Sequence, residues 1–308
     1  MNIDVATRTI GSILFLIFLG YSSRKIGFLK QGDERVFSAY IYYFALPSLF
    51  IINLTEVDFT FERLRFIFAG QIPVILIIAV YVIAYMILKF SRETLYLLIV
   101  STVFGSLAFF GLPFVILAFP GELILATLAV ASISIVAVPI SIGVLELHQI
   151  GESALTKTAR HIARKLSKNP LIISIVLGFI LSLLKVEIPS PLKIALEMLG
   201  GTTATVAIFM LGVFFYGRKY VNISHGLQLS LLRAIVLPLI ALFVASWLNL
   251  TMSEKAIIII MHGCPVAVSN IVLSERYNFY KETMASLILI SSIAAGIYLN
   301  LWLFLLGY

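Results

Sequence analysis

Apolar runs long enough to cross a lipid bilayer follow one another along almost the whole chain. A spanning helix needs about 20 apolar residues, and ten runs of this order lie between charged or turn-rich breaks. Their approximate bounds are 7–27, 36–55, 65–88, 95–118, 122–147, 170–185, 191–215, 227–249, 254–274 and 281–305. These runs leave little chain for a domain outside the membrane.

The composition agrees with a protein that folds in lipid. Hydrophobic residues make up 61% and charged residues 12% of the 308 residues, whereas soluble domains have about 45–50% and about 25%. Soluble enzymes, nucleic-acid-binding modules and disordered tails are therefore excluded as classes. The first run lacks a basic start and a small-residue cleavage site, so we expect it to remain as a span.

The runs predict an all-α integral membrane protein. They are apolar on every face, whereas the strands of a membrane barrel alternate polar and apolar residues. The single cysteine, Cys264, lies inside one run, so no disulfide framework is expected. The four histidines lack metal-ligand spacing, and neither HExxH, GxSxG nor paired intramembrane aspartates occur. We therefore expect neither an enzyme nor a metal site.

The basic residues predict the orientation of the chain. The connections after runs 1, 3, 5, 7 and 9 carry 15 of the 22 Lys and Arg, and the opposite side, with both termini, carries 6. An excess of basic residues marks the cytoplasmic side. We therefore expect both termini outside the cell, and we expect the net charge of +7 to report topology rather than nucleic-acid binding.

One connection is long. In residues 152–168 the apolar positions Leu155, Ala159, Ile162 and Leu166 recur at helical spacing between basic residues, which predicts an amphipathic helix on the cytoplasmic surface. It is either a linker or a regulatory or partner site. It divides the chain into a first five-helix repeat (1–150), the linker (151–169) and a second five-helix repeat (170–308).

Five is an odd number, so the second half enters the membrane from the opposite side. This predicts the 5+5 inverted repeat of many secondary transporters. The fourth run contains Gly111-Leu112-Pro113 and the ninth contains Gly263-Cys264-Pro265, 152 residues later. The third and eighth runs share a central proline, at Pro73 and Pro238.

The paired Gly-x-Pro tripeptides predict two broken helices. Proline removes a backbone donor, and glycine permits non-helical angles. The half-helices starting at Pro113 and Pro265 would then direct their N-terminal N–H groups at the break, which makes an anion site without a formal charge. The alternative is that each proline only kinks a packed helix.

Few ionisable side chains lie in the apolar runs, and the small polar residues named next either bind a ligand or serve as ordinary contacts between helices. Ser106, Ser269 and Asn270 flank the breaks and are candidates for substrate binding, together with Gly111, Leu112, Pro113, Gly263, Cys264 and Pro265. Arg233 and His262 are candidate charge or proton elements. Arg233 either snorkels or pairs with carbonyls, or else contacts a substrate carboxylate, and His262 either exchanges a proton or is structural. Glu146 and His148 are expected to reach water at the end of run 5.

The segment 265–277 resembles the span-9 signature of the auxin efflux carrier family, which includes plant PIN-type carriers and bacterial malate-permease-like proteins. Supporting stretches are Arg24-Lys25-Ile26-Gly27, Ala45-Leu46-Pro47, Gly111-Leu112-Pro113 and Asn169-Pro170-Leu171-Ile172. The resemblance covers essentially the whole chain. The family often has asparagines where this chain has Ser106 and Ser269, and a proline near Thr205.

The resemblance implies ten helices of the bile-acid-symporter or NhaA type. Spans 1, 2, 6 and 7 would form a scaffold, and spans 3–5 and 8–10 a transport domain that moves as an elevator, with helices 4 and 9 crossing at their breaks. It also implies transport of organic anions and a homodimer formed through the scaffold.

We expect a transporter of a small organic anion, a carboxylate similar to auxin or malate, in the plasma membrane of a prokaryotic cell, without a cofactor. The alternatives are a symporter coupled to H⁺ or Na⁺, a cation/proton antiporter, which the lack of acidic residues near the breaks disfavours, and a sensor that does not transport.

Overall fold

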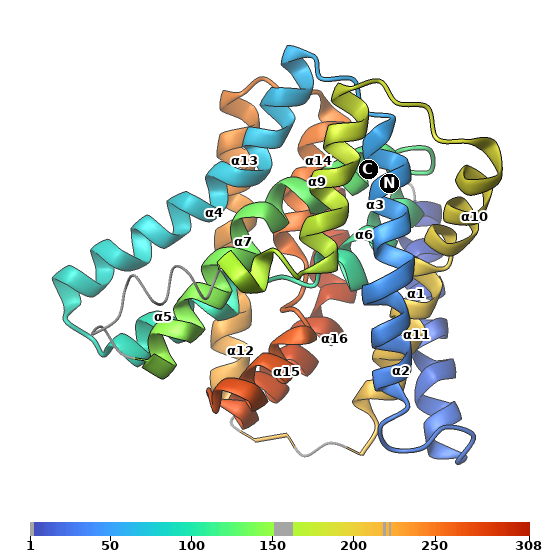
Figure 1. The fold of residues 1–308 in the computed structure, drawn as a ribbon. Coiled ribbons are helices and arrows are strands. Elements are labelled where there is room, and N and C mark those ends of the chain that lie inside the picture. Colours follow the sequence, from blue (N-terminus) through green and yellow to red (C-terminus); the bar gives the residue numbers. More distant parts are fainter. Residues whose placement is uncertain (1–2, 151–162, 218–219, 222) are drawn as a thin grey trace.

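The computed structural model describes residues 3–150, 163–217, 220–221 and 223–308, and within them every regular element is a helix (Figure 1). Labels with η mark π-helical turns. The elements are α1 (Ile3–Lys25), α2 (Glu34–Tyr40), η1 (Ile41–Ala45), α3 (Leu46–Thr55), α4 (Phe61–Leu88), α5 (Arg92–Val103), η2 (Leu107–Gly111), α6 (Leu112–Ala118), α7 (Leu123–Ile150), α9 (Pro170–Leu183), α10 (Ser190–Gly201), α11 (Thr203–Phe215), α12 (Ile223–Leu231), η4 (Leu232–Val236), α13 (Leu237–Trp247), α14 (Met252–Gly263), α15 (Ser269–Tyr277) and α16 (Lys281–Leu305).

Each apolar run coincides with one helix or with helices in series. By length and composition, six helical stretches of the described residues can cross a bilayer: Glu34–Thr55, Phe61–Leu88, Leu123–Gln149, Ser190–Phe215, Ile223–Trp247 and Lys281–Leu305. Leu107–Ala118 and Pro170–Leu183 are shorter apolar helices. The all-helical membrane fold is thus confirmed, whereas ten spans in two inverted repeats stay a prediction.

Prolines explain the three π-helical turns found among the described residues. The turns η1, η2 and η4 end two residues before Pro47, Pro113 and Pro238, respectively. Proline removes one N–H and crowds the carbonyl four residues earlier, and a wider turn relieves both problems. The helix therefore continues through Gly111-Leu112-Pro113, where the sequence predicted an interruption: Gly111 has helical φ and ψ of −63° and −49°.

One group of helices comprises α1, α3, α9, α10 and α11. Close contacts at glycines hold this group together. Gly20 of α1 lies against the backbone of Phe209, and Gly212 of α11 lies against the backbone of Ile17, so neither position has room for a Cβ. Gly178 of α9 faces α3 in the same way. In lipid, such small residues allow close packing between helices, which drives their association.

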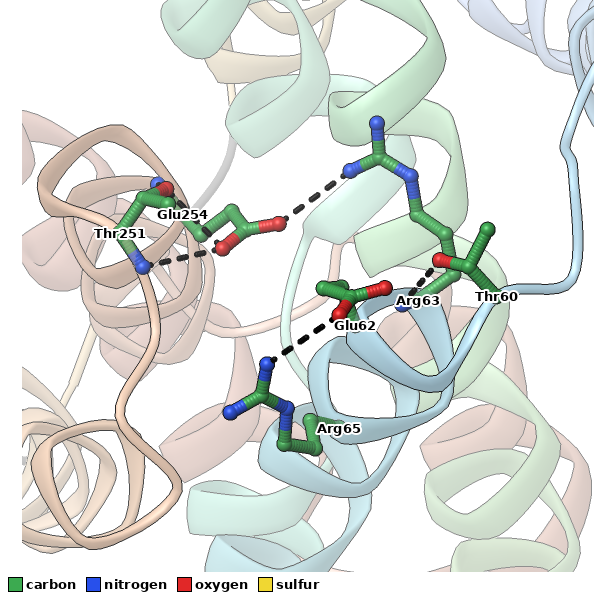
Figure 2. A network of polar contacts seen from close by, with 6 residues as sticks. All are labelled: Thr60, Glu62, Arg63, Arg65, Thr251 and Glu254. Carbon is green, nitrogen blue, oxygen red and sulfur yellow. Dashed lines mark hydrogen bonds and ion pairs between the residues drawn. The ribbon is translucent and has the colours of Figure 1, made fainter.

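A second group comprises α4, α5, α7 and α12–α16, in which α4 packs on α7 and α13, α13 on α14, and α12 on α16, whereas α2 packs on α11 and η1 on α3 of the first group. Figure 2 shows a polar network at one end of this group. The Arg63 guanidinium of α4 donates to the Glu254 carboxylate of α14 over 3.2 Å, and Glu254 also accepts from the backbone N–H of Thr251 at 3.0 Å. Arg65 donates to the carbonyl of Leu248 just after α13, at 3.4 Å. Three helices are therefore joined at this end.

Most of the predicted amphipathic linker, residues 151–162, lies outside the described residues. Beyond it, Lys165 donates to the Glu146 carboxylate of α7 and to the Tyr277 hydroxyl of α15. Glu146 is 2% exposed, so the prediction that it reaches water is wrong: a lysine and a phenol take the place of water. His148 is half-buried and pairs with Glu93 at 2.9 Å. The predicted domain boundaries are not tested.

Candidate functional site

Two interrupted helices lie against each other at the centre of the second group. The first interruption is residues 104–106, between α5 and η2, and the second is residues 264–268, between α14 and α15. The Ser106 N–H donates to the Pro265 carbonyl at 2.7 Å, and the Ala267 N–H donates to the Phe104 carbonyl at 2.9 Å. Backbone groups that leave the helices are therefore satisfied by each other, as a lipid environment demands.

The helices that follow the interruptions begin at Leu107 and Ser269. The sequence predicted starts at Pro113 and Pro265. The first start lies six residues earlier because the π-helical turn absorbs Pro113, and the second lies four residues later because residues 265–267 are extended against residues 104–106. Both helix starts nevertheless lie next to the crossing, the place where residues 104–106 and 264–268 contact each other.

Arg233 joins the two helices that precede the interruptions. Its guanidinium donates through Nε to the Cys264 carbonyl and through Nη1 to the Thr102 carbonyl. The side chain is 1% exposed, so it does not snorkel. A Cβ at Gly105 would overlap with the guanidinium. The positive charge therefore sits at the carbonyl ends of α5 and α14, where helix dipoles are negative.

A cavity of about 530 Å³ lies beside the crossing. Its wall includes the two helix starts, with Ser106 and Leu107 on one side and Val268 and Ser269 on the other, and it is completed by residues of α2, η1, α7, α9 and α11. The first N–H groups of a helix have no partner within it and carry partial positive charge. Both helix starts therefore border the same cavity.

Ser106 carries the clearest sign of an absent partner. Its side chain is 1% exposed and lines the cavity, and within the described residues its Oγ has no hydrogen-bond partner. A buried hydroxyl without a partner costs about 1–3 kcal/mol, so a bound ligand would remove this cost. Glu34 is the one acidic residue among those described in the wall, and Arg24 binds its carboxylate at 3.1 Å. The cavity therefore suits an anion better than a cation.

The predicted residues divide into two sets. Ser106 and Ser269 line the cavity. The others lie in the packed crossing: Gly111 has no room for a Cβ against the Cys264 sulfur, and Asn270 donates weakly to the Val100 carbonyl at 3.5 Å, while its Oδ1 has no partner in the described residues. Leu112, Pro113, Gly263 and Pro265 are buried there as well. Whether any of them binds substrate stays a prediction.

His262 lies away from the cavity wall. It is 1% exposed, and the backbone of Ala69 and Gly70 in α4 lies beside its ring. Pro73 cannot supply the N–H that Ala69 would bind in an intact helix. The imidazole is thus placed next to a carbonyl freed by proline, which is a structural position. A proton role for His262 stays a prediction.

The sequence did not identify most of the wall as a site, including the polar residues Arg35, Ser134 and Asn169. Arg35 is exposed, and its guanidinium makes no ion pair or hydrogen bond within the described residues. It stands in the first turn of α2, where the helix dipole disfavours a cation, and this mismatch was the signal available in the sequence. Asn169 caps α9 by accepting from the Leu171 N–H at 3.0 Å. In the described residues no three His, Cys, Asp or Glu gather to hold a metal.

Comparison with known proteins agrees with this picture. A family model described as membrane transport protein matches residues 5–303. An uncharacterized transporter of Methanocaldococcus jannaschii is 25% identical over 301 residues, which cover 94% of this chain and 95% of that protein.

Proposed function

The chain belongs to the membrane transport protein family, as its resemblance to the auxin efflux carriers indicated, and we propose that it is a secondary transporter of a small organic anion. It is a multi-pass membrane protein of a transporter family. The observation that carries the choice of an anion is the unpartnered Ser106 hydroxyl, in a cavity bordered by two helix starts.

We propose a place in the cavity for each part of such a substrate. A carboxylate would accept from the hydroxyls of Ser106 and Ser269 and from N–H groups at the helix starts, since charge-assisted bonds of this kind are the strong ones. The aromatic residues Phe104, Phe109 and Phe214 line the same space. An apolar body would lie against them, as in other largely apolar ligand pockets. The proposed substrate is therefore a carboxylate with an apolar portion.

We propose an elevator mechanism from the packing of the two helix groups. Each group is closely packed within itself, by glycines in the first and by helix contacts and the Arg63–Glu254 network in the second. The cavity takes its wall from both: α9 and α11 belong to the first group, and Ser106 and Ser269 to the second. A shift of the second group along the first would carry the substrate across the membrane.

The double substitution Ser106→Ala and Ser269→Ala tests the anion site. Each hydroxyl bond to a charged group contributes about 1.5–3 kcal/mol, so kcat/KM for uptake should fall at least about tenfold. Uptake of radiolabelled malate, benzoate and indole-3-acetate into proteoliposomes would measure it, with the exposed Ser246→Ala as a control. Unchanged uptake by the double variant would remove the site, and binding without flux in the unsubstituted protein would indicate a sensor.

Arg35 is proposed to draw the anion into the cavity from the cytoplasm. Its guanidinium makes no ion pair within the described residues, and the neighbouring connection is on the side predicted to be cytoplasmic. Arg35→Gln should raise KM severalfold at low salt, and the difference should shrink near 1 M salt, where the Debye length falls to about 3 Å. The exposed Lys25→Gln should change KM little. A salt-independent defect would contradict electrostatic attraction.

A further inference from the structure

Arg233 is a buried cation whose charge is balanced by backbone dipoles. Its guanidinium binds the carbonyls of Cys264 and Thr102, at the negative ends of α14 and α5. Within the described residues no carboxylate forms an ion pair with it, although a buried charge normally needs such a partner. The two helix ends thus supply the counter-charge together.

The bound carbonyls are the groups that a coupling cation would need. In transporters with broken helices, the carbonyl oxygens of unwound segments and the C-terminal ends of half-helices coordinate the coupling Na⁺ or H⁺. Here the guanidinium of Arg233 occupies the place of such a cation. Gly105 lies so close to the guanidinium that there is no room for a Cβ. A second positive ion about 4 Å away would bind about a thousandfold more weakly at an effective dielectric constant of about 20.

We propose that Arg233 is a built-in replacement for the coupling cation, so that anion transport by this protein does not require Na⁺. The predicted independence of transport from Na⁺ rests on the proposed function. Arg233 itself is a positioning residue: it fixes the ends of α5 and α14, and thereby leaves the opposite helix starts, at Leu107 and Ser269, facing the cavity. Arginine remains protonated in proteins, so the charge is permanent.

The test begins with stability measurements in the absence of substrate. Exchange of NaCl for choline chloride should leave the unfolding temperature of the purified protein unchanged. Arg233→Ala should unfold at a lower temperature, and 20 mM guanidinium should restore much of the loss, whereas 20 mM tetramethylammonium should not. Arg65→Ala removes a guanidinium from another helix-end carbonyl, that of Leu248, and it should gain nothing from guanidinium because that side chain is partly exposed.

The uptake measurement separates this proposal from the proposed function. Uptake in proteoliposomes should differ less than twofold between Na⁺ and choline media. Stabilisation of the unsubstituted protein by Na⁺, or Na⁺-dependent uptake, would overturn the proposal while leaving transport intact. Absence of uptake with guanidinium rescue retained would overturn the transport function alone. If Arg233→Ala does not fold, Arg233→Lys is tested with the same ions. A lysine cannot bridge both carbonyls in one plane, so the unfolding temperature should fall in part and should not respond to Na⁺. Stabilisation of this variant by Na⁺ would contradict the proposal.

Discussion

Gly105→Ala is expected to abolish anion uptake and to lower the unfolding temperature by at least about 5 °C. The added Cβ would overlap with the Arg233 guanidinium, which is 1% exposed and is bound to two carbonyls. Overpacking alone costs about 1–3 kcal/mol. Displacing the guanidinium from the Thr102 and Cys264 carbonyls would leave a buried charge without its partners, at about 3–5 kcal/mol. A single methyl group thus acts on the whole crossing.

A matched control exists in α16, where a Cβ at Gly296 would meet no atom within 4 Å. Gly296→Ala should keep both uptake and unfolding temperature, since alanine also favours the helix. Differential scanning fluorimetry and proteoliposome uptake measure the two effects. If Gly105→Ala resembled Gly296→Ala in both, the close contact between Gly105 and Arg233 would not exist in the membrane.

The double substitution Gly20→Ala and Gly212→Ala should separate α1 from α11. Each added Cβ would overlap with a backbone carbonyl of the other helix, of Phe209 and of Ile17, and backbone cannot rotate aside as a side chain can. The two clashes, at about 1–3 kcal/mol each, should lower the unfolding temperature and expose α1 to proteolysis. Because the second helix group is not touched, its Arg63–Glu254 network should remain.

Gly11→Ala in the same helix α1 is the control, because a Cβ there would meet no atom within 4 Å. Limited proteolysis followed by mass spectrometry would locate the exposed segment. Cleavage confined to the second helix group, with α1 protected, would contradict the assignment of Gly20 and Gly212 to a packed scaffold.

The helices could be predicted from the sequence because bilayer thickness fixes the length of an apolar run, and this length does not depend on how the helices pack. The position of the first interruption could not. Pro113 reports only local backbone chemistry, whereas residues 104–106 leave the helix because the Pro265 carbonyl and the Arg233 guanidinium hold them. These contacts join distant segments and leave no local pattern.

The candidate site could be predicted only in part, again because contacts between distant segments leave no local pattern in the sequence. Ser106 and Ser269 were identified because they flank the two Gly-x-Pro tripeptides and can form hydrogen bonds. Arg35 was counted only as a topological charge, since nothing in the local sequence shows that α2 borders the cavity. The carbonyl partners of Arg233 were among the alternatives, but which helix ends it joins depends on the fold.

The hydrogen bonds between the two interruptions join residues about 160 positions apart. During synthesis, the first half of the chain enters the membrane with residues 104–106 lacking these partners. The crossing can therefore form only after residue 267 has been synthesised, and a chain that stops earlier leaves these backbone groups without their partners. The two halves of the chain are therefore joined at the crossing by backbone groups that neither half can satisfy in the same way alone.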